Sequence, residues 1–403
     1  MDPLEILAHL AGVGTPPDGP TALAISVGLD ATIERLKSET LPFLAGGGSE
    51  LQFVYGQYGR GKSHFLQTVR EVASRKGFVT AYVDCRAGRS PFKSVRDTYV
   101  MLAENMAAPP THDSTLPAKG VAGLIKQQVQ GGDRHEVLQL LTNIRGNPHL
   151  APDFRNLVYA YALRCVANDS RHALREALEA LLNADASYRV TLGALHQANP
   201  DLPRPIGKLG SRNAGLWIRS LLSLPRALGY PGLVVLFDET ERGHSFGTRF
   251  SRGQQEHLAN LRNFVDYMAL GTFRGVAIFY AVVEDFIEVA RERLEALSQR
   301  IERVRISLDN DSRVDDRNPR AVWVSLDELT FPTPLEPSFF GELGKKIIGV
   351  GLDAGLTQGR ARSLAPLFEA KAEEAAGSFY EGAVREFVKF AAAQVAQGVT
   401  SDA

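Results

Sequence analysis

The stretch GQYGRGKS at Gly56–Ser63 decides how the rest of the chain is interpreted. It matches the pattern G-x-x-x-x-G-K-[ST] at every constrained position, and it follows a short apolar, β-prone run at Leu51–Tyr55. A helical pattern begins at Lys62 and ends at Gly77. A glycine-rich turn between a strand and a helix lets backbone N–H groups point inward at an anion, and the helix N-terminus adds partial positive charge. The stretch therefore predicts a phosphate-binding loop in an α/β core.

Each residue of this loop is expected to lie against the phosphates of a nucleotide. The residues are Gly56, Gln57, Tyr58, Gly59, Arg60, Gly61, Lys62 and Ser63. In such loops the lysine reaches the β- and γ-phosphates, and the final hydroxyl, here that of Ser63, binds Mg²⁺. A glycine-rich turn that matches by chance is the alternative. The strand before the loop and the helix after it favour the phosphate loop.

A second motif has the form expected of a companion to the phosphate loop. Leu233–Phe237 is an apolar, strand-like run that ends in two acids, Asp238 and Glu239. We expect Asp238 to hold Mg²⁺ through water and Glu239 to polarise the attacking water as a general base. The alternative is an acidic strand end that caps the next helix. A glutamate directly after the aspartate indicates ATP hydrolysis, since this arrangement is that of ATPases with a catalytic glutamate.

The remaining β-prone runs alternate with helix-length segments. They lie at Val79–Asp84, Val276–Val283, Val304–Leu308 and Val322–Leu326. Such alternation predicts a parallel sheet with helices between its strands.

The chain is too long for a single ordinary core, and its pattern predicts four parts. An N-terminal helical segment occupies 1–49, and an ATPase core occupies 50–99 and 213–326. A large helical insertion at 100–212 interrupts the core, and a C-terminal helical lid follows at 327–403.

Composition excludes several classes of protein. The 403 residues are 44% hydrophobic and 23% charged, which excludes wholesale disorder. Lys and Arg number 45 against 46 Asp and Glu, so the net charge is −1 and any contact with DNA needs a local basic patch. Two cysteines and no apolar run of membrane-spanning length predict a cytoplasmic protein without a membrane span. The nine histidines are scattered without the spacing of a zinc site.

These motifs resemble those of AAA+-type ATPases, and more closely those of the ATP-binding proteins of bacterial BREX phage-defence loci, the BrxD-like family. GQYGRGKSHFL at Gly56–Leu66 and LGYPGLVVLFDETE at Leu228–Glu241 carry the resemblance, and Ala259–Arg262 and Leu294–Ile301 add to it. The resemblance covers about 50–90 and 215–310, roughly a third of the chain. It implies an AAA+-type P-loop core with Walker A and Walker B motifs and a helical lid.

Three further residues take roles through this resemblance. Arg300 stands where similar proteins place an arginine finger that reaches a neighbouring subunit's γ-phosphate. Arg385 resembles the arginine that the lid contributes to the nucleotide, and His64 belongs to the family pattern of the loop. Each residue also has a simpler interpretation. Arg300 would be an ordinary surface arginine, and Arg385 a helix-face arginine paired at i,i+4. His64 would be a residue of the first helical turn that packs beside the nucleotide.

One departure from the pattern bears on hydrolysis. Related ATPases end the fourth strand with a small polar residue that orients the attacking water, whereas this chain has apolar residues before Glu284. Hydrolysis is therefore expected to be slow or to require a partner.

The resemblance implies an ATPase that acts as a nucleotide-driven switch in a BREX-like defence complex. Its ligands would be ATP and Mg²⁺, and its partners would be other defence-system proteins. It would bind DNA directly or through these partners. A trans-acting Arg300 would require a homo-oligomer. Two alternatives stay open: a DNA loader or remodeller similar to origin-recognition ATPases, and a non-hydrolysing ATP-gated scaffold that holds partner proteins.

Overall fold

The protein is represented by a computed structural model. It describes residues 1–56, 59–85, 91–111, 117–166, 172–185, 187, 191–238, 252–282, 323–326, 330, 332, 335–377 and 382–402.

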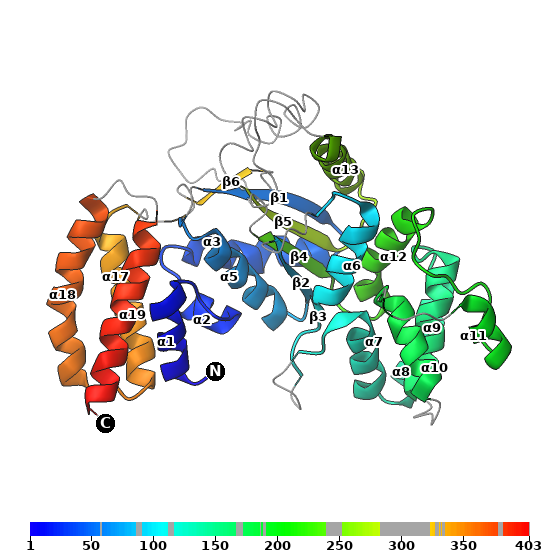
Figure 1. The fold of residues 1–403 in the computed structure, drawn as a ribbon, viewed down its shortest axis with the longest axis horizontal. Coiled ribbons are helices and arrows are strands. Elements are labelled where there is room, and N and C mark those ends of the chain that lie inside the picture. The colour runs from blue at the N-terminus through cyan, green and yellow to red at the C-terminus, as the bar shows by residue number, and fades with distance from the viewer. Residues whose placement is uncertain are drawn as a thin grey trace. The chain divides into compact units, whose positions relative to one another are not determined.

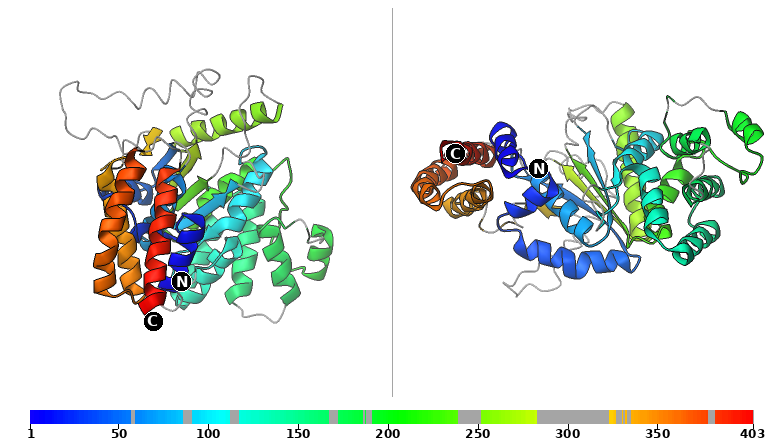
Figure 2. Two further views of the ribbon diagram at one scale, coloured as in Figure 1. Left: turned by 60° about the vertical axis from the view of Figure 1, so that its left-hand side comes forward. Right: turned by 90° about the horizontal axis from the view of Figure 1, so that it is seen from below.

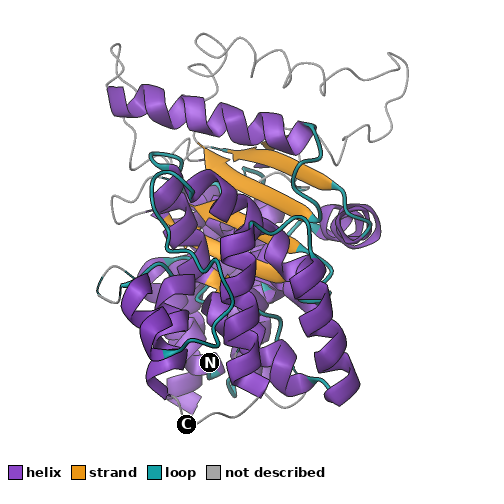
Figure 3. Cartoon of the chain, turned by 90° about the vertical axis from the view of Figure 1, so that its right-hand side faces the viewer, coloured by secondary structure: helices purple, strands orange, loops and turns teal. Residues whose placement is uncertain are grey.

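Six strands among these residues form one mostly parallel sheet. They are β1 (Ser49–Tyr55), β2 (Val79–Asp84), β3 (Met106–Ala107), β4 (Leu233–Asp238), β5 (Val276–Val282) and β6 (Trp323–Ser325). Their order is β3-β2-β4-β5-β1-β6, with β2–β4 and β1–β6 parallel and β3 antiparallel at the β2 edge. Every position of β4 and β5 is buried, as expected where helices cover both faces of a sheet (Figure 3).

Helices connect the strands and make up most of the remaining described residues. They are α1 (Pro3–Val13), α2 (Gly19–Ala24), α3 (Asp30–Arg35), the π-helix η1 (Leu36–Thr40), α4 (Leu41–Ala45), α5 (Lys62–Arg75), α6 (Val95–Asn105), α7 (Gly120–Gly131), α8 (Arg134–Gly146), α9 (Pro152–Val166), α10 (His172–Leu182), α11 (Leu192–Ala198), α12 (Ala214–Ala227), α13 (Arg252–Ala269), α17 (Pro337–Asp353), α18 (Gln358–Gly377) and α19 (Ala383–Asp402).

The chain divides into two compact units. The first comprises Met1–Thr40, Gln52–Val72 and Tyr280–Ala403, and the second comprises Leu41–Leu51 and Ala73–Phe279. Both are discontinuous in sequence, so each depends on contacts between distant segments.

In the first unit, the C-terminal helices form a bundle onto which the N-terminus folds. α17 packs on α18 and α19, and α1 packs on α19, as the blue helix beside the red one shows in Figures 1 and 2. Phe340 and Phe387 are buried at its centre with ring centroids 5.1 Å apart, and Phe368 packs on Phe387 at 6.3 Å. Apolar residues spaced along these helices thus give the first unit its own core.

In the second unit, the helices that follow β2 pack around an aromatic cluster. Tyr99 of α6, Phe154 of α9 and Trp217 of α12 are buried with ring centroids 5.3 to 6.5 Å apart. Their polar atoms are paired, since Trp217 Nε1 donates to Asp153 Oδ2 at 2.9 Å and the Tyr99 hydroxyl donates to the Leu182 carbonyl at 2.6 Å. Burial raises the pKa of Tyr99, so its hydroxyl remains a donor.

The strands predicted at 51–55, 79–84, 233–237, 276–283 and 322–326 are present, within two residues at each end. The α/β fold class with a mostly parallel sheet is thereby confirmed. The two-residue strand β3 was not predicted, because so short an edge strand has no period of its own. The strand predicted at 304–308 lies outside the described residues. The four-part division of the chain stays a prediction.

Truncating the centre of the C-terminal bundle should destabilise the protein. Phe340→Ala is expected to lower the free energy of unfolding by about 3–5 kcal/mol, because a fully buried ring leaves a cavity. Leu367→Ala is the control, since that side chain on α18 is 42% exposed and should cost less than about 1 kcal/mol. Urea unfolding followed by circular dichroism measures both, and equal losses would contradict this account of the core.

Candidate functional site

The described part of the loop, Gly56 and Gly59–Ser63, has backbone features typical of a phosphate-binding turn. It leaves the carboxyl end of β1, and α5 begins at Lys62. Gly59 and Gly61 have φ angles of +82° and +92°, a region that side chains disfavour and glycine accepts readily. The N–H groups of the first turn of α5 therefore lie where the loop ends.

Lys62 lies across this loop rather than in solvent. Its ammonium donates a 2.7 Å hydrogen bond to the Gly56 carbonyl, and the side chain is 7% exposed. A buried cation gains when a second acceptor, such as a phosphate oxygen, enters its range. The lysine is thus held at the position from which it could bind an anion in the loop.

The residue before α19 lies against the loop. A Cβ atom at Gly59 would lie only 2.6 Å from the Gly382 Cα and 3.0 Å from its backbone nitrogen. Gly382 directly precedes α19, and its carbonyl accepts from the Glu386 N–H. Glycine at position 59 is therefore needed for this close backbone approach, which brings the loop next to the C-terminal bundle within the first unit.

His64, the residue after the loop, joins a hydrogen-bond network. Its Nε2 lies 2.9 Å from the Ser26 hydroxyl, which donates to the Ala22 carbonyl at 2.8 Å. The Ser26 hydroxyl also lies 3.1 Å from the Thr68 hydroxyl, so three polar groups surround it. Lys346 of α17 donates to the Ser26 carbonyl, so the network connects α5, the residues after α2 and α17.

The same surroundings keep the His64 ring neutral. Burial, and secondarily the positive charge of Lys346, lower the pKa of His64 from 6.5 to about 4. A neutral ring adds no charge beside the phosphate loop, and its hydrogen bond fixes the first turn of α5. These contacts favour a positioning role for His64.

Arg385 lies in the first turn of α19, and its side chain packs on the C-terminal end of α1. A Cβ at Gly14, the C-cap of α1, would lie 2.6 Å from Arg385 Cγ. Its role toward the nucleotide stays a prediction, and Gly382, three residues earlier and directly before α19, is the residue that meets the loop.

In the second unit, the end of β4 carries a buried acid. Asp238 is the last residue of β4, is 2% exposed, and accepts a hydrogen bond from the Tyr82 hydroxyl of β2. Its register partner on β2 is Asp84, which is exposed. Two carboxylates and a phenol therefore lie together at the carboxyl ends of neighbouring parallel strands, where α/β proteins bind ligands.

Tyr82 was missed by the sequence analysis, although a signal existed. VTAYVD and LVVLFD are both six-residue strands that end in aspartate. They pair along their whole length, with Asp84 opposite Asp238. In that register Tyr82 is the diagonal neighbour of Asp238, within reach of a long side chain. Choosing this register, however, requires knowing that the two strands are neighbours.

Comparison with known protein families decides which family this geometry belongs to. The model of the BREX system ATP-binding protein family BrxC/D matches residues 5–336, most of the chain. The chain belongs to the BrxC/D family. Comparisons with curated proteins and with solved structures give no match. Membership supports binding of ATP by a protein of a BREX system, and the matched region contains both the phosphate loop and Asp238.

One of the stretches that suggested BrxD-like proteins has a packing role here. Asn260 of α13 donates a 2.8 Å hydrogen bond to the carbonyl of Phe92, a buried residue with a φ angle of +67°. The Phe92 ring packs on Phe237 of β4 at 5.4 Å. Asn260 thus supports the strand that ends in Asp238.

Several predicted site residues lie outside the described part of the BrxC/D chain. They are Gln57, Tyr58, Glu239, Arg300 and the polar candidate Glu284. Ala281 and Val282, which precede Glu284, are buried in β5. The predicted roles of these residues stay predictions.

Two surveys of the described residues bear on cofactors and membranes. Nowhere in that part of the chain do three His, Cys, Asp or Glu residues cluster as they do around a metal ion. None of its helices combines the length and the apolar character needed to cross a membrane.

Gly59→Ala should weaken ATP binding by at least about tenfold. A methyl group there would meet the Gly382 backbone and would force a positive φ that costs an alanine about 1–2 kcal/mol. Gly215→Ala on α12 is the control, since its Cβ would meet nothing within 4 Å. Calorimetric titration with ATP measures both variants, and wild-type affinity in Gly59→Ala would contradict the close approach.

Proposed function

We propose that this BrxC/D protein hydrolyses the ATP that it binds, as an AAA+-type ATPase, and that the nucleotide switches its conformation within a BREX defence complex. The single observation that carries the proposal is the Lys62 ammonium held inside a glycine-rich turn at the start of α5. Family membership supports ATP as the ligand of that turn.

The residues present fit a magnesium ion. Mg²⁺ bound to ATP usually takes one or two protein oxygens and completes its shell with phosphates and water. The Ser63 hydroxyl and the Asp238 carboxylate would be those protein ligands. The Tyr82 hydroxyl donates a hydrogen bond to the Asp238 carboxylate. The ion would supply neutralisation of the charge that develops on the phosphates.

The roles of the chain's own groups follow from their chemistry. Lys62 and the N–H groups of the loop bind and orient the phosphates. Glu239 directs a water at the γ-phosphate and accepts its proton. Arg300 of a neighbouring copy would add a second cation, which is part of the proposal and requires an oligomer.

The switch is supported by contacts within the first unit. The loop meets α19 through Gly382, and α5 meets α17 through Ser26 and Lys346. A γ-phosphate that moves the loop would therefore strain two helices of the C-terminal bundle directly. We propose that partner proteins of the same defence system respond to this conformational change. DNA would be bound directly by the chain or through these partners.

A second candidate function has one observation in its favour. Ala281 and Val282 leave the described end of β5 apolar, where related ATPases orient the attacking water with a polar residue. A protein that binds ATP and hardly turns it over would serve as an ATP-gated scaffold for its partners. Loading or remodelling of DNA remains the third candidate.

Glu239→Gln separates an ATPase from a scaffold. We expect it to lower steady-state phosphate release at least about 100-fold while ATP affinity stays within about twofold, because only the base is lost. Glu369→Gln is the control, since Glu369 is exposed on α18. Phosphate release is measured with and without DNA. Absence of turnover in the wild type under both conditions would favour the scaffold.

Tyr82→Phe tests how Asp238 is held. The variant loses only the hydroxyl that donates to the carboxylate, so we expect the Mg²⁺ concentration for half-maximal turnover to rise about three- to tenfold. Tyr267→Phe, an exposed tyrosine of α13, should leave it unchanged. The assignment fails if the Mg²⁺ requirement of Tyr82→Phe equals that of the wild type. It also fails if the variant's ATP affinity measured in EDTA falls by the same factor as its Mg²⁺ requirement rises.

A further inference from the structure

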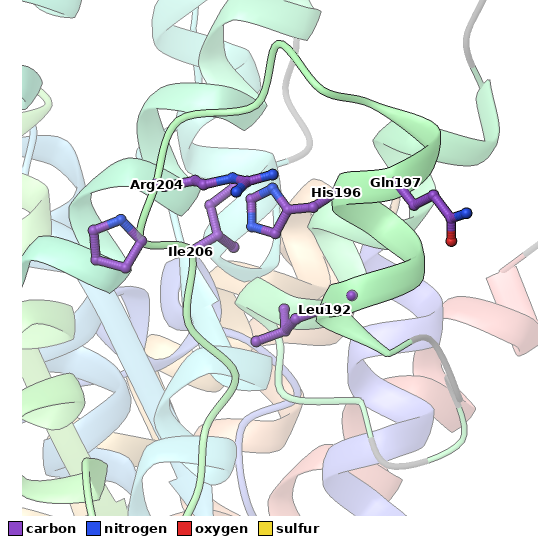
Figure 4. Close-up of a pocket in the computed structure, with 7 residues that line it drawn as sticks. Leu192, His196, Gln197, Arg204 and Ile206 are labelled. Atoms are coloured by element: carbon purple, nitrogen blue, oxygen red, sulfur yellow. The ribbon is translucent and has the colours of Figure 1, made fainter.

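A pocket lies in the second unit, among the helices that follow β2. It has a volume of about 700 Å³ and lies between α11 and the loop that leads to α12 (Figure 4). The side chains that matter to its chemistry are Leu192, His196, Gln197, Arg204, Pro205 and Ile206. The volume is in the range of pockets that bind ligands. None of the residues proposed for ATP lines it.

Two polar groups of this pocket have no partner among the described residues. The Arg204 guanidinium is exposed and makes no ion pair or hydrogen bond there, and His196 Nδ1 is buried without a hydrogen bond. Figure 4 shows these two side chains close together on one wall, whereas Gln197 points away. Of the two groups, the exposed Arg204 guanidinium is the one that a ligand can reach, and it can form a charge-assisted hydrogen bond with an anion.

The surrounding chain determines the sign of the charge that the pocket accepts. From Leu202 to Phe237 the sequence has five Lys and Arg residues and no Asp or Glu. Lys208, Arg212 and Arg219 are exposed in this stretch, as is Arg204. The preceding acid, Asp201, is paired with Arg164 at 3.0 Å. An anionic group is therefore the ligand that this surface favours.

The lining distinguishes between classes of anion. Leu192, Pro205 and Ile206 supply aliphatic surface, and no Phe, Tyr or Trp ring is among the described residues that line the pocket. Proteins that bind single-stranded nucleic acids stack the bases on aromatic rings, which this lining does not provide. Aliphatic surface beside an arginine suits a peptide that carries a carboxylate next to a Leu or Ile side chain.

We infer that this pocket is a docking site for an acidic segment of a partner protein. Its carboxylate binds Arg204, and its aliphatic side chain packs on Leu192 and Ile206. The site is separate from the residues proposed for ATP, so it can recruit a partner whether or not the chain hydrolyses nucleotide.

The test begins with an array of ten-residue peptides, each with two Glu and one Leu or Ile at varied positions among Gly and Ser. A matched array carries Gln in place of Glu. We expect the full-length chain to bind members of the Glu array and to ignore their Gln counterparts. An array without a Glu-dependent binder would overturn the inference.

The peptide bound best is then titrated by fluorescence anisotropy against three proteins. Arg204→Gln should weaken its binding at least about tenfold relative to wild type, because the paired cation is lost. Arg212→Gln removes an exposed arginine of the same stretch that does not line the pocket, and should weaken binding less than about twofold. Equal losses in the two variants would show a diffuse basic surface and overturn the inference.

Single-stranded dT10 serves as the competing anion. It should bind the wild type more weakly than the best peptide does. If dT10 instead bound more tightly, and this binding depended on Arg204, the pocket would be a nucleic-acid site and the inference would be overturned. The thermal midpoint and ATP affinity of Arg204→Gln should equal those of the wild type, since Arg204 is exposed and lies outside the phosphate loop. All titrations omit nucleotide, so they are independent of hydrolysis.

Discussion

The hydrogen bond from Lys62 to the Gly56 carbonyl is the interaction on which the rest of the site depends. It closes the loop between β1 and α5 and holds a buried ammonium at its centre. Such a cation is tolerated because a carbonyl partly pairs it, and it gains further from a bound phosphate. The positive φ angles of Gly59 and Gly61 are the backbone consequence of wrapping a loop so tightly.

The phosphate loop and the helix that follows it contact several distant segments of the first unit. Gly382 lies against the loop, and His64 ties α5 through Ser26 to Lys346 of α17. The family match ends at 336, directly before α17 begins at Pro337. Helices outside the family match thus lie next to the loop that lies within it.

Sequence predicts those parts of the site that are local. The phosphate loop could be recognised because its glycines, Lys62 and Ser63 lie within eight residues, and β4 because its residues are apolar without interruption. The hydrogen bond from Tyr82 to Asp238 joins residues 156 positions apart, and the bond from Lys346 to Ser26 spans 320. No local period encodes such pairs. The close approach of Gly59 to Gly382 cannot be predicted from the sequence either. A turn with a positive φ angle already accounts for a glycine at position 59, whether or not another segment lies against it.

Lys62→Ala, titrated with ATP and Mg²⁺ by calorimetry, tests the central claim most directly. Lys345→Ala is the control, because Lys345 is exposed on α17 and makes only a long ion pair of 3.9 Å with Glu342. If the phosphates of ATP lie in the loop at Gly56–Ser63, removing the charge-assisted contact of Lys62 should weaken binding by about tenfold or more while Lys345→Ala binds as the wild type does. Unchanged affinity in Lys62→Ala would place the nucleotide elsewhere and contradict the account.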